Sequence, residues 1–262
     1  MLKSNHIDPE LIGANLKTKR IGRKIVVFSC TTSTNDIAAE YAKSKDNDGL
    51  VIFADEQTAG RGRAGAKWFS GPAESILCSA VLINCKLTSE LLSISCAVAV
   101  AEAIGKLDSN YAKIKWPNDI VINGKKIAGI LLESRDYDTH RCHIIGIGIN
   151  CHQKQQSFPP ELQTIATSID TEGNVFCDRV SLAKRLLSSL DCWLAAAEKK
   201  SSTVVQRWKR LSSELNRPIR LTFGGAVFNG SCIGIDPEKG LIVQLDTGGI
   251  RMFEAAQTTI AK

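Results

Sequence analysis

Two apolar runs joined by Asn123-Gly124 constrain the fold more than any other feature of the chain. The stretch is "AKIKWPNDIVINGKKIAGILLES", residues 112–134. Asn-Gly between such runs is the strongest short signal for a β-hairpin, because these two residues accept the positive φ angles of a tight turn. The sequence therefore predicts antiparallel pairing at this point. Strands and helices do not alternate regularly along the chain, so a Rossmann-type sheet is not expected.

Further apolar runs and capping residues predict the remaining elements of a core domain. Runs rich in apolar and β-branched residues predict strands at residues 24–30, 49–57, 75–83 and 140–150. Helices are expected from Pro9 to about Lys17, after Ser33 or Thr34, after Thr88, after Asp178, and through residues 204–211. In the helix after Thr88, apolar residues recur at helical spacing on one face, from Leu91 to Gly105.

The character of the sequence changes near residue 216. Short apolar runs are separated there by Gly-Gly, Pro-Glu-Lys-Gly and Thr-Gly-Gly, a spacing that predicts a small β barrel of about 45 residues. We therefore expect two domains. Residues 1–215 form an α+β (α/β) core with a mixed, largely antiparallel sheet, and residues 216–262 form the barrel.

Composition narrows the class of protein. The net charge of +6 favours acidic ligands or an acidic partner, but it is too weak and diffuse to indicate nucleic-acid binding by itself. Nine cysteines without CxxC pairs, including Cys30, Cys78 and Cys96 in apolar runs, indicate reduced, buried thiols in a cytoplasmic protein. No apolar run approaches the roughly 18 residues of a membrane span, and no signal peptide is recognised.

The stretch "TAGRGRAGAKW", residues 58–68, directly follows an expected buried strand and carries Arg61, Arg63 and Lys67. Glycines allow the backbone to approach an anion, and arginines offer forked donors to phosphate or carboxylate. The spacing is not that of a Walker loop. A basic surface turn is the alternative, but this pattern more often holds a ligand.

Four further motifs contain polar residues or glycines, and each motif has both a ligand-binding and a purely structural interpretation. "KWPND" (115–119) places Asn118 and Asp119 either at a pocket rim or in a simple turn. Lys126 opens an apolar strand and is either directed outward or paired with an anion. Alternating glycines in "GIGIN" (146–150) suit a flat ligand or close helix–strand packing. "TTSTND" (31–36) offers hydroxyl and amide groups to a ligand, or caps a helix.

Metal and hydrolase sites are not indicated. His140 and His143 lie in an expected strand, whose register does not give a clean tetrahedral set, and no second CxxC or HxxxH supports them. No GxSxG elbow is present.

Taken together, these motifs resemble the biotin protein ligases. The resemblance rests on "STN" (33–35), "EQTAGRGRAGAKW" (56–68), "KWPND", "KKIAGILLE" (125–133) and "GIGIN", in this order, and it covers nearly the whole chain. It implies a class II synthetase-like core, an SH3-like C-terminal domain, and ATP-dependent attachment of biotin to a carrier protein. ATP and biotin are then the substrates, with Mg²⁺ accompanying the ATP.

The resemblance also assigns roles to single residues. It implies biotin binding by Ser33, Thr34, Asn35, Gln57, Gly60, Arg61, Gly62, Arg63, Lys126, Gly129 and Gly146. It implies ATP or adenylate binding by Arg61, Arg63, Gly65, Trp68, Asn118, Lys126 and Asn150. The catalytic groups are Lys126, Arg63 and Asp119, the last near the point where the acceptor lysine enters, and no protein-bound metal site is expected.

Two departures from the family pattern affect the expected activity. Ala66 stands where the family often has arginine, so we expect slower turnover or faster release of the intermediate. The first expected strand starts at Lys24, which leaves too few residues ahead of it for a winged helix. We therefore expect the monofunctional class, without DNA binding.

Partners and rival functions follow from the same resemblance. The implied partner is a biotin carboxyl carrier protein, the acetyl-CoA carboxylase subunit. No membrane association is expected, and relatives are often homodimers. The alternatives are a lipoate or octanoate ligase on a related fold, and a non-catalytic biotin binder. The Gly/Arg loop with "KWPND" argues against the first, and the retained Lys126 and loop arginines argue against the second.

Overall fold

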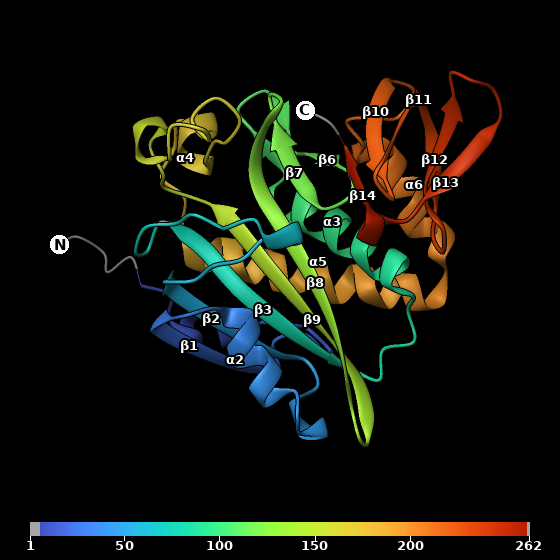
Figure 1. Cartoon of the computed structure of the whole chain (residues 1–262). Helices are drawn as coiled ribbons and strands as arrows, with labels where there is room; N and C mark the ends of the chain where they lie inside the picture. Colours follow the sequence, from blue (N-terminus) through green and yellow to red (C-terminus); the bar gives the residue numbers. More distant parts are fainter. Residues whose placement is uncertain (1–5, 261–262) are drawn as a thin grey trace.

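A seven-stranded mixed sheet forms the centre of the computed structural model, which describes residues 6–260 (Figure 1). In spatial order, the strands of this sheet are β1 (Lys24–Thr31), β2 (Leu50–Gln57), β3 (Ser75–Ile83), β9 (His140–Asn150), β8 (Lys125–Tyr137), β7 (Asp119–Ile122) and β6 (Lys113–Lys115). The β1–β2 pair is parallel, and every other neighbouring pair in this sheet is antiparallel. The predicted mixed, largely antiparallel sheet is confirmed.

The predicted hairpin is present between β7 and β8. Asn123 and Gly124 form its turn with φ angles of 49° and 78°, as a tight two-residue turn requires. β3 starts and ends where the apolar run predicted. A two-residue pair of strands, β4 (Lys106–Leu107) and β5 (Asn110–Tyr111), was not predicted, since so short a run leaves no periodic signal.

Helices cover both faces of the sheet. α3 (Ser89–Ile104) and α5 (Arg179–Lys199) pack on one face, and α6 (Ser201–Leu211) packs against these two helices. α2 (Thr34–Tyr41) covers the other face over β2, β3 and β9 (Figure 1). Thr88 and Asp178 cap α3 and α5 as predicted, each accepting a backbone N–H. The short α4 (Ile169–Gly173) lies after β9 and was not predicted.

Two helix predictions need correction. α1 (Pro9–Gly13) does not reach Lys17, because Asn15 adopts a left-handed φ of 60° and the chain turns away. α3 is buried on nearly all sides and not along one face, because it lies between the sheet and the helices α5 and α6. The apolar spacing seen in the sequence was part of an almost continuous apolar surface.

The cysteines follow the prediction in part. Cys78 and Cys96 are buried, and burial raises the pKa of the Cys78 thiol to about 12. Cys30 is exposed, which corrects the prediction, because β1 is an edge strand and this side chain faces away from the core. Within residues 6–260, no helix is long and apolar enough to cross a membrane.

Five strands form a separate small β domain at the C-terminal end, as predicted. In spatial order they are β13 (Ile250–Phe253), β12 (Gly240–Leu245), β11 (Ala226–Asp236), β10 (Pro218–Phe223) and β14 (Thr258–Ile260), all antiparallel. This domain contacts the core through α3: Glu90 accepts the Ala255 N–H at 2.8 Å, and the Thr88 hydroxyl donates to Pro237 O at 3.1 Å. The boundary at residue 215/216 stays a prediction.

Candidate functional site

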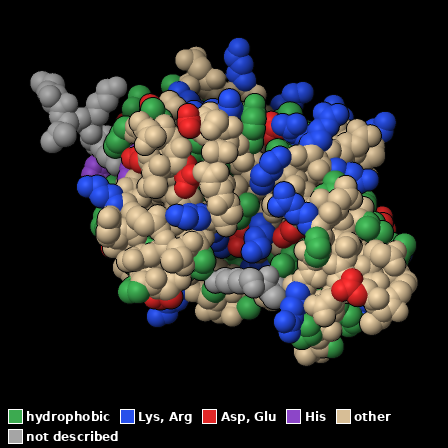
Figure 2. Space-filling view, turned by 90° about the horizontal axis from the view of Figure 1, so that it is seen from above, with side chains coloured by type: hydrophobic (Ala, Val, Ile, Leu, Met, Phe, Trp, Pro, Cys, Tyr) green, Lys and Arg blue, Asp and Glu red, His purple; other side chains and the backbone are tan. Residues whose placement is uncertain are grey.

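A cleft of about 960 Å³ lies on the α2 face of the sheet, opposite α3 and α5. α2, β8 and β9 form its floor, and its walls are residues 61–68, residues 115–119 and the C-terminal residues 256, 257, 259 and 260. Figure 2 shows that this side of the molecule is hollowed, with Lys and Arg side chains around the hollow and acidic side chains among them. The cleft therefore lies between the core and the C-terminal domain.

Alternating glycines of β9 form part of the floor. Ile145, Ile147 and Ile149 belong to the hydrophobic core, so Gly146 and Gly148 face the cleft. A Cβ at Gly146 would lie 2.4 Å from Asn35 Oδ1, and one at Gly148 would lie 2.4 Å from Trp68 Cε2. Only glycine permits these contacts. The ring that lies against this face is therefore the protein's own indole.

Neighbouring polar groups of α2 lie at one end of the floor. The amide oxygen of Gln57 accepts from Thr34 N at 2.7 Å and from its hydroxyl at 3.0 Å. Ser79 donates to Asn35 Oδ1 at 2.6 Å. The Asn35 Nδ2 is buried and has no hydrogen-bond partner within residues 6–260. Its donors can therefore serve a ligand, because a buried amide left unpaired is costly. Ser33 precedes α2, but its side chain makes no capping hydrogen bond.

The Gly/Arg loop closes on itself as a small hairpin. The backbones of Arg61 and Lys67 form an antiparallel β-bridge, and Trp68 N donates to Gly60 O at 3.0 Å. The Arg61 guanidinium makes a bidentate contact to Asp36, at 2.8 and 2.6 Å, and lies 3.6 Å from Glu133. The hydrogen bond to Asp36 raises the pKa of Arg61, and the same bond lowers the pKa of Asp36. Arg61 thus already holds a carboxylate at the cleft rim.

Arg63 joins the loop to both other walls of the cleft. Its Nη1 donates to Asn118 Oδ1 at 3.1 Å, and its Nη2 donates to Ala255 O and to Thr258 O, the latter at 3.2 Å. Burial lowers the pKa of Arg63 from its usual value. The carbonyl partners come from the C-terminal domain, which the sequence did not link to this loop.

Lys126 and Asp119 form an ion pair across the β7–β8 hairpin, with 2.5 Å between Nζ and Oδ1. The Lys126 ammonium also lies 5.5 Å from the centre of a Trp68 ring. Gly129 is next to both, since a Cβ there would lie 2.9 Å from the indole and 3.1 Å from Lys126 Nζ. Of the two interpretations of Lys126, pairing with an anion is therefore confirmed. Both side chains remain about one-third exposed, so a ligand can reach them.

Comparison with known proteins identifies the family of this chain. A model described as the Biotin/lipoate A/B protein ligase family matches residues 27–150. The bifunctional ligase/repressor BirA of Bacillus subtilis (strain 168) is 32% identical over 258 residues, covering 97% of this chain and 79% of that protein. The chain belongs to the biotin protein ligase family.

Two further comparisons agree with this assignment. The biotin–acetyl-CoA-carboxylase ligase of Paracoccus denitrificans is 31% identical over 234 residues, covering 87% of this chain and 96% of that protein. The solved structure of the biotin protein ligase from Aquifex aeolicus in complex with biotin and ATP has a TM-score of 0.79 and 24% identity. It covers 92% of this chain and 99% of that one. The predicted family, fold and enzyme class, a biotin ligase, are confirmed.

The cleft brings together most residues that the resemblance assigned to the ligase site. Gly60 and Asn150 do not line it. Gly60 packs against the other end of the loop, since a Cβ there would meet Trp68 O at 2.9 Å. Asn150 is buried and its side chain donates to Thr167 O at 2.9 Å, so it holds the segment around Thr167 in place. The roles assigned to these residues stay predictions.

The sequence analysis assigned no role to several residues that line or border the cleft. They are Asp36, Leu77, Ser79, Lys115, Leu131, Leu132, Glu133, Gly148, Gln257 and Ile260. Gly148 could have been found, since it continues the glycine alternation that singled out Gly146. Ser79 and residues 256–260 could not, because they reach the cleft by sheet register and domain docking.

Proposed function

We propose that this ligase activates biotin with ATP as biotinyl-5′-AMP and then transfers biotin to a lysine of a biotin carboxyl carrier protein. The Lys126–Asp119 ion pair beside Gly129 carries the proposal, because it fixes a reachable ammonium in the same cleft as the Gly/Arg loop. A carboxylate and a phosphate need such a cation in order to approach each other. The name of the Paracoccus ligase supports biotin and the carboxylase carrier as substrates.

In the first step, a biotin carboxylate oxygen would attack the α-phosphorus of ATP, and pyrophosphate would leave. Negative charge spreads over the phosphoryl oxygens in such a step, so fixed cations stabilise it. Lys126 can supply one cation directly. Arg61 can supply another by exchanging Asp36 for a ligand anion, since this pair is exposed at the rim.

Mg²⁺ would neutralise the charge of the ATP phosphates. Within the described part of the chain, no group of three or more His, Cys, Asp or Glu side chains could hold a metal ion. The phosphates and water would therefore supply most of its ligands, which is usual for Mg²⁺.

In the second step, the neutral amine of the acceptor lysine would attack the acyl carbon, with AMP leaving. Asp119 can orient this amine or accept its proton, because its carboxylate lies in the cleft wall. Closure of the Gly/Arg loop would protect the adenylate from water.

The Trp68 indole lies on the glycine floor in this structure, so a ligand ring that uses Gly148 has to displace it. We therefore expect residues 60–68 to rearrange when the adenylate binds. An identical loop in ligand-free and adenylate-bound crystals would contradict this expectation. The cytoplasm is the proposed location, since all nine cysteines are free thiols.

Biotin-dependent exchange of labelled pyrophosphate into ATP tests the first step directly. The expected result is exchange with biotin, and transfer of biotin to a carrier domain on its addition. Exchange with lipoate instead of biotin would support the related lipoate ligase. Absence of exchange with either would support a non-catalytic binder and overturn the proposal.

A further inference from the structure

Glu214 is a buried carboxylate that belongs to none of the sequence motifs. Only 7% of its surface is exposed, and its Oε2 accepts the backbone N–H of Trp116 at 2.9 Å. Its Oε1 is also buried, with no hydrogen-bond partner within residues 6–260. A buried, incompletely paired carboxylate is unfavourable for folding. Its position beside Trp116 therefore needs a physical reason.

The segment that carries Glu214 connects the core to the C-terminal domain. It follows α6 and runs along β6, the edge strand of the large sheet: Ser212 bridges to Ile114, and Ser213 N donates to Ile114 O at 2.9 Å. Arg217 N then donates to Glu214 O at 2.9 Å, just before β10 begins. Glu214 is thus held by the main chain on both sides.

The partner of Glu214, Trp116, opens the turn that carries two residues of the site. Asn118 accepts a hydrogen bond from Arg63, and Asp119 pairs with Lys126. The Trp116 side chain is 1% exposed, so it cannot shift without disturbing the core. Its N–H bond to Glu214 fixes the start of the turn, and a shift there would change both contacts.

The charge of Glu214 changes near neutral pH. Burial raises its pKa to about 7, opposed by the Trp116 N–H and the positive charge of Lys115 and assisted by the negative charge of Asp119. Cys232 of β11 is another titratable neighbour, and its pKa is raised to about 11, mainly by burial. A hydrogen bond to an ionised carboxylate is roughly twice as strong as one to a neutral group. Ionised Glu214 therefore holds Trp116 more firmly.

We propose that Glu214 is a positioning residue for the adenylation step: by accepting the Trp116 N–H, it holds the 116–119 turn so that Asp119 and Asn118 keep Lys126 and Arg63 in place. The proposal rests on the proposed function, since that step is the reaction in question. It also makes the geometry of the cleft depend on the segment that leads into the C-terminal domain.

The test compares Glu214→Gln, Glu214→Ala and the wild type in biotin-dependent pyrophosphate exchange between pH 6 and 8.5. Exchange is used because it does not involve the acceptor lysine. Glutamine keeps an oxygen acceptor without charge, so we expect kcat about 5-fold lower at pH 8, unchanged at pH 6, and no step near pH 7. Alanine removes the acceptor, and we expect a loss of about 10–100-fold at both pH values. The KM values for ATP and biotin should change by less than about 3-fold.

Glu102→Gln is the control, because Glu102 pairs with Arg207 between α3 and α6 and does not line the cleft. It should keep the wild-type pH profile. A Glu214→Gln profile identical to that of the wild type would overturn the inference, while exchange by the wild type would still support the proposed function. Absence of exchange in the wild type at every pH would overturn both.

A second measurement does not depend on activity. The amide ¹H–¹⁵N signal of Trp116 should move with a midpoint near pH 7 in the wild type and stay fixed in Glu214→Gln. A signal that moves equally in both proteins would show that Glu214 does not control this N–H. The pH dependence of the Trp116 signal remains decisive even if Glu214→Ala fails to fold, because it compares only the wild type and Glu214→Gln.

Discussion

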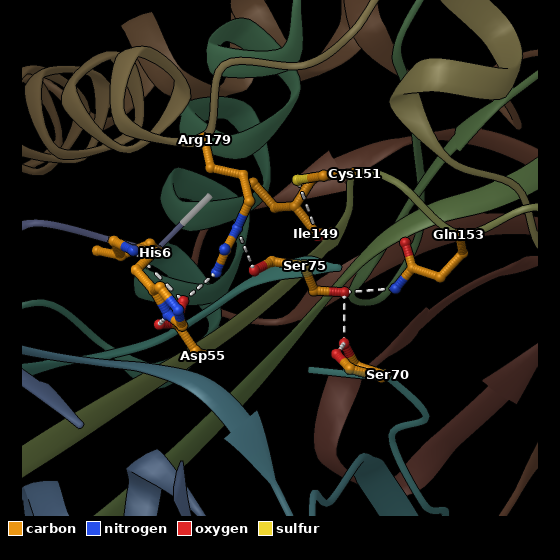
Figure 3. A network of polar contacts seen from close by, with 10 residues as sticks. His6, Asp55, Ser70, Ser75, Ile149, Cys151, Gln153 and Arg179 are labelled. Atoms are coloured by element: carbon orange, nitrogen blue, oxygen red, sulfur yellow. Dashed lines mark hydrogen bonds and ion pairs between the residues drawn. The ribbon is translucent and has the colours of Figure 1, made fainter. Parts of the chain in front are cut away.

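Breaking the buried ion pair between Asp55 and Arg179 should destabilise the protein strongly (Figure 3). Arg179 Nη2 lies 2.7 Å from Asp55 Oδ1, and the two side chains are 2% and 6% exposed. Arg179 Nε also donates to Ser75 O at 3.0 Å, and His6 Nδ1 lies 2.7 Å from Asp55 Oδ2. The network thus joins α5, β2, β3 and the N-terminal segment.

Replacement of Asp55 by alanine removes this carboxylate while the Arg179 charge stays buried. Loss of one partner of a buried pair costs about 3–5 kcal/mol. One kcal/mol shifts Tm by roughly 2–4 °C in a chain of this size, so we expect Tm to fall by about 6–20 °C. Calorimetry and urea unfolding at pH 7 measure this change.

Asp136→Ala is the matched control, because Asp136 also pairs with an arginine but at the surface. Its carboxylate lies 3.3 Å from Arg141, and the side chains are 75% and 61% exposed. Such pairs contribute less than about 1 kcal/mol. Equal destabilisation by the two substitutions would refute the argument that burial makes the Asp55 pair important.

Four further substitutions test the site. Lys126→Met should lower the rate of pyrophosphate exchange by about 10²–10³-fold without loss of the folded state by circular dichroism, and near wild-type exchange would exclude Lys126 from the transition state. Gly148→Ala should displace the indole of Trp68 and change its fluorescence, whereas an unchanged spectrum would show that the ring does not lie on β9. Ala66→Arg adds a cation to the cleft and should lengthen the lifetime of the adenylate; an unchanged lifetime and ATP affinity would exclude that contact. Glu214→Gln should raise stability relative to the wild type at pH 8. The pKa of Glu214 in the folded state, about 7, lies above the ordinary value of 4.5. The wild type therefore loses up to about 3 kcal/mol of unfolding free energy as the pH rises from 4.5 to 7. If the wild type and Glu214→Gln changed equally in urea-unfolding stability between about pH 5 and 8, this sign would be contradicted.

Local signals predicted most individual elements of the fold. Asn123-Gly124 predicted its hairpin because few residue pairs accept two successive positive φ angles. Thr88 and Asp178 predicted helix starts because their side chains can accept a free backbone N–H. The end of α1 at Gly13 and the burial of α3 on nearly all sides were not predicted. A left-handed asparagine and the packing of α5 and α6 decided them, and neither leaves a periodic pattern.

The sequence by itself determined which charged and glycine residues the cleft contains. Its motifs singled out Lys126, Asp119, Arg61, Arg63 and Gly146 of β9, because backbone freedom and charge are properties of the residue types. Tertiary structure alone decided their partners. It placed the Trp68 indole on Gly148, Asp36 against Arg61, and the carbonyls of Ala255 and Thr258 against Arg63. It also placed Glu214 behind Trp116, 98 positions earlier in the sequence. These contacts depend on strand order and domain docking, which bring distant segments together without any local sequence signal.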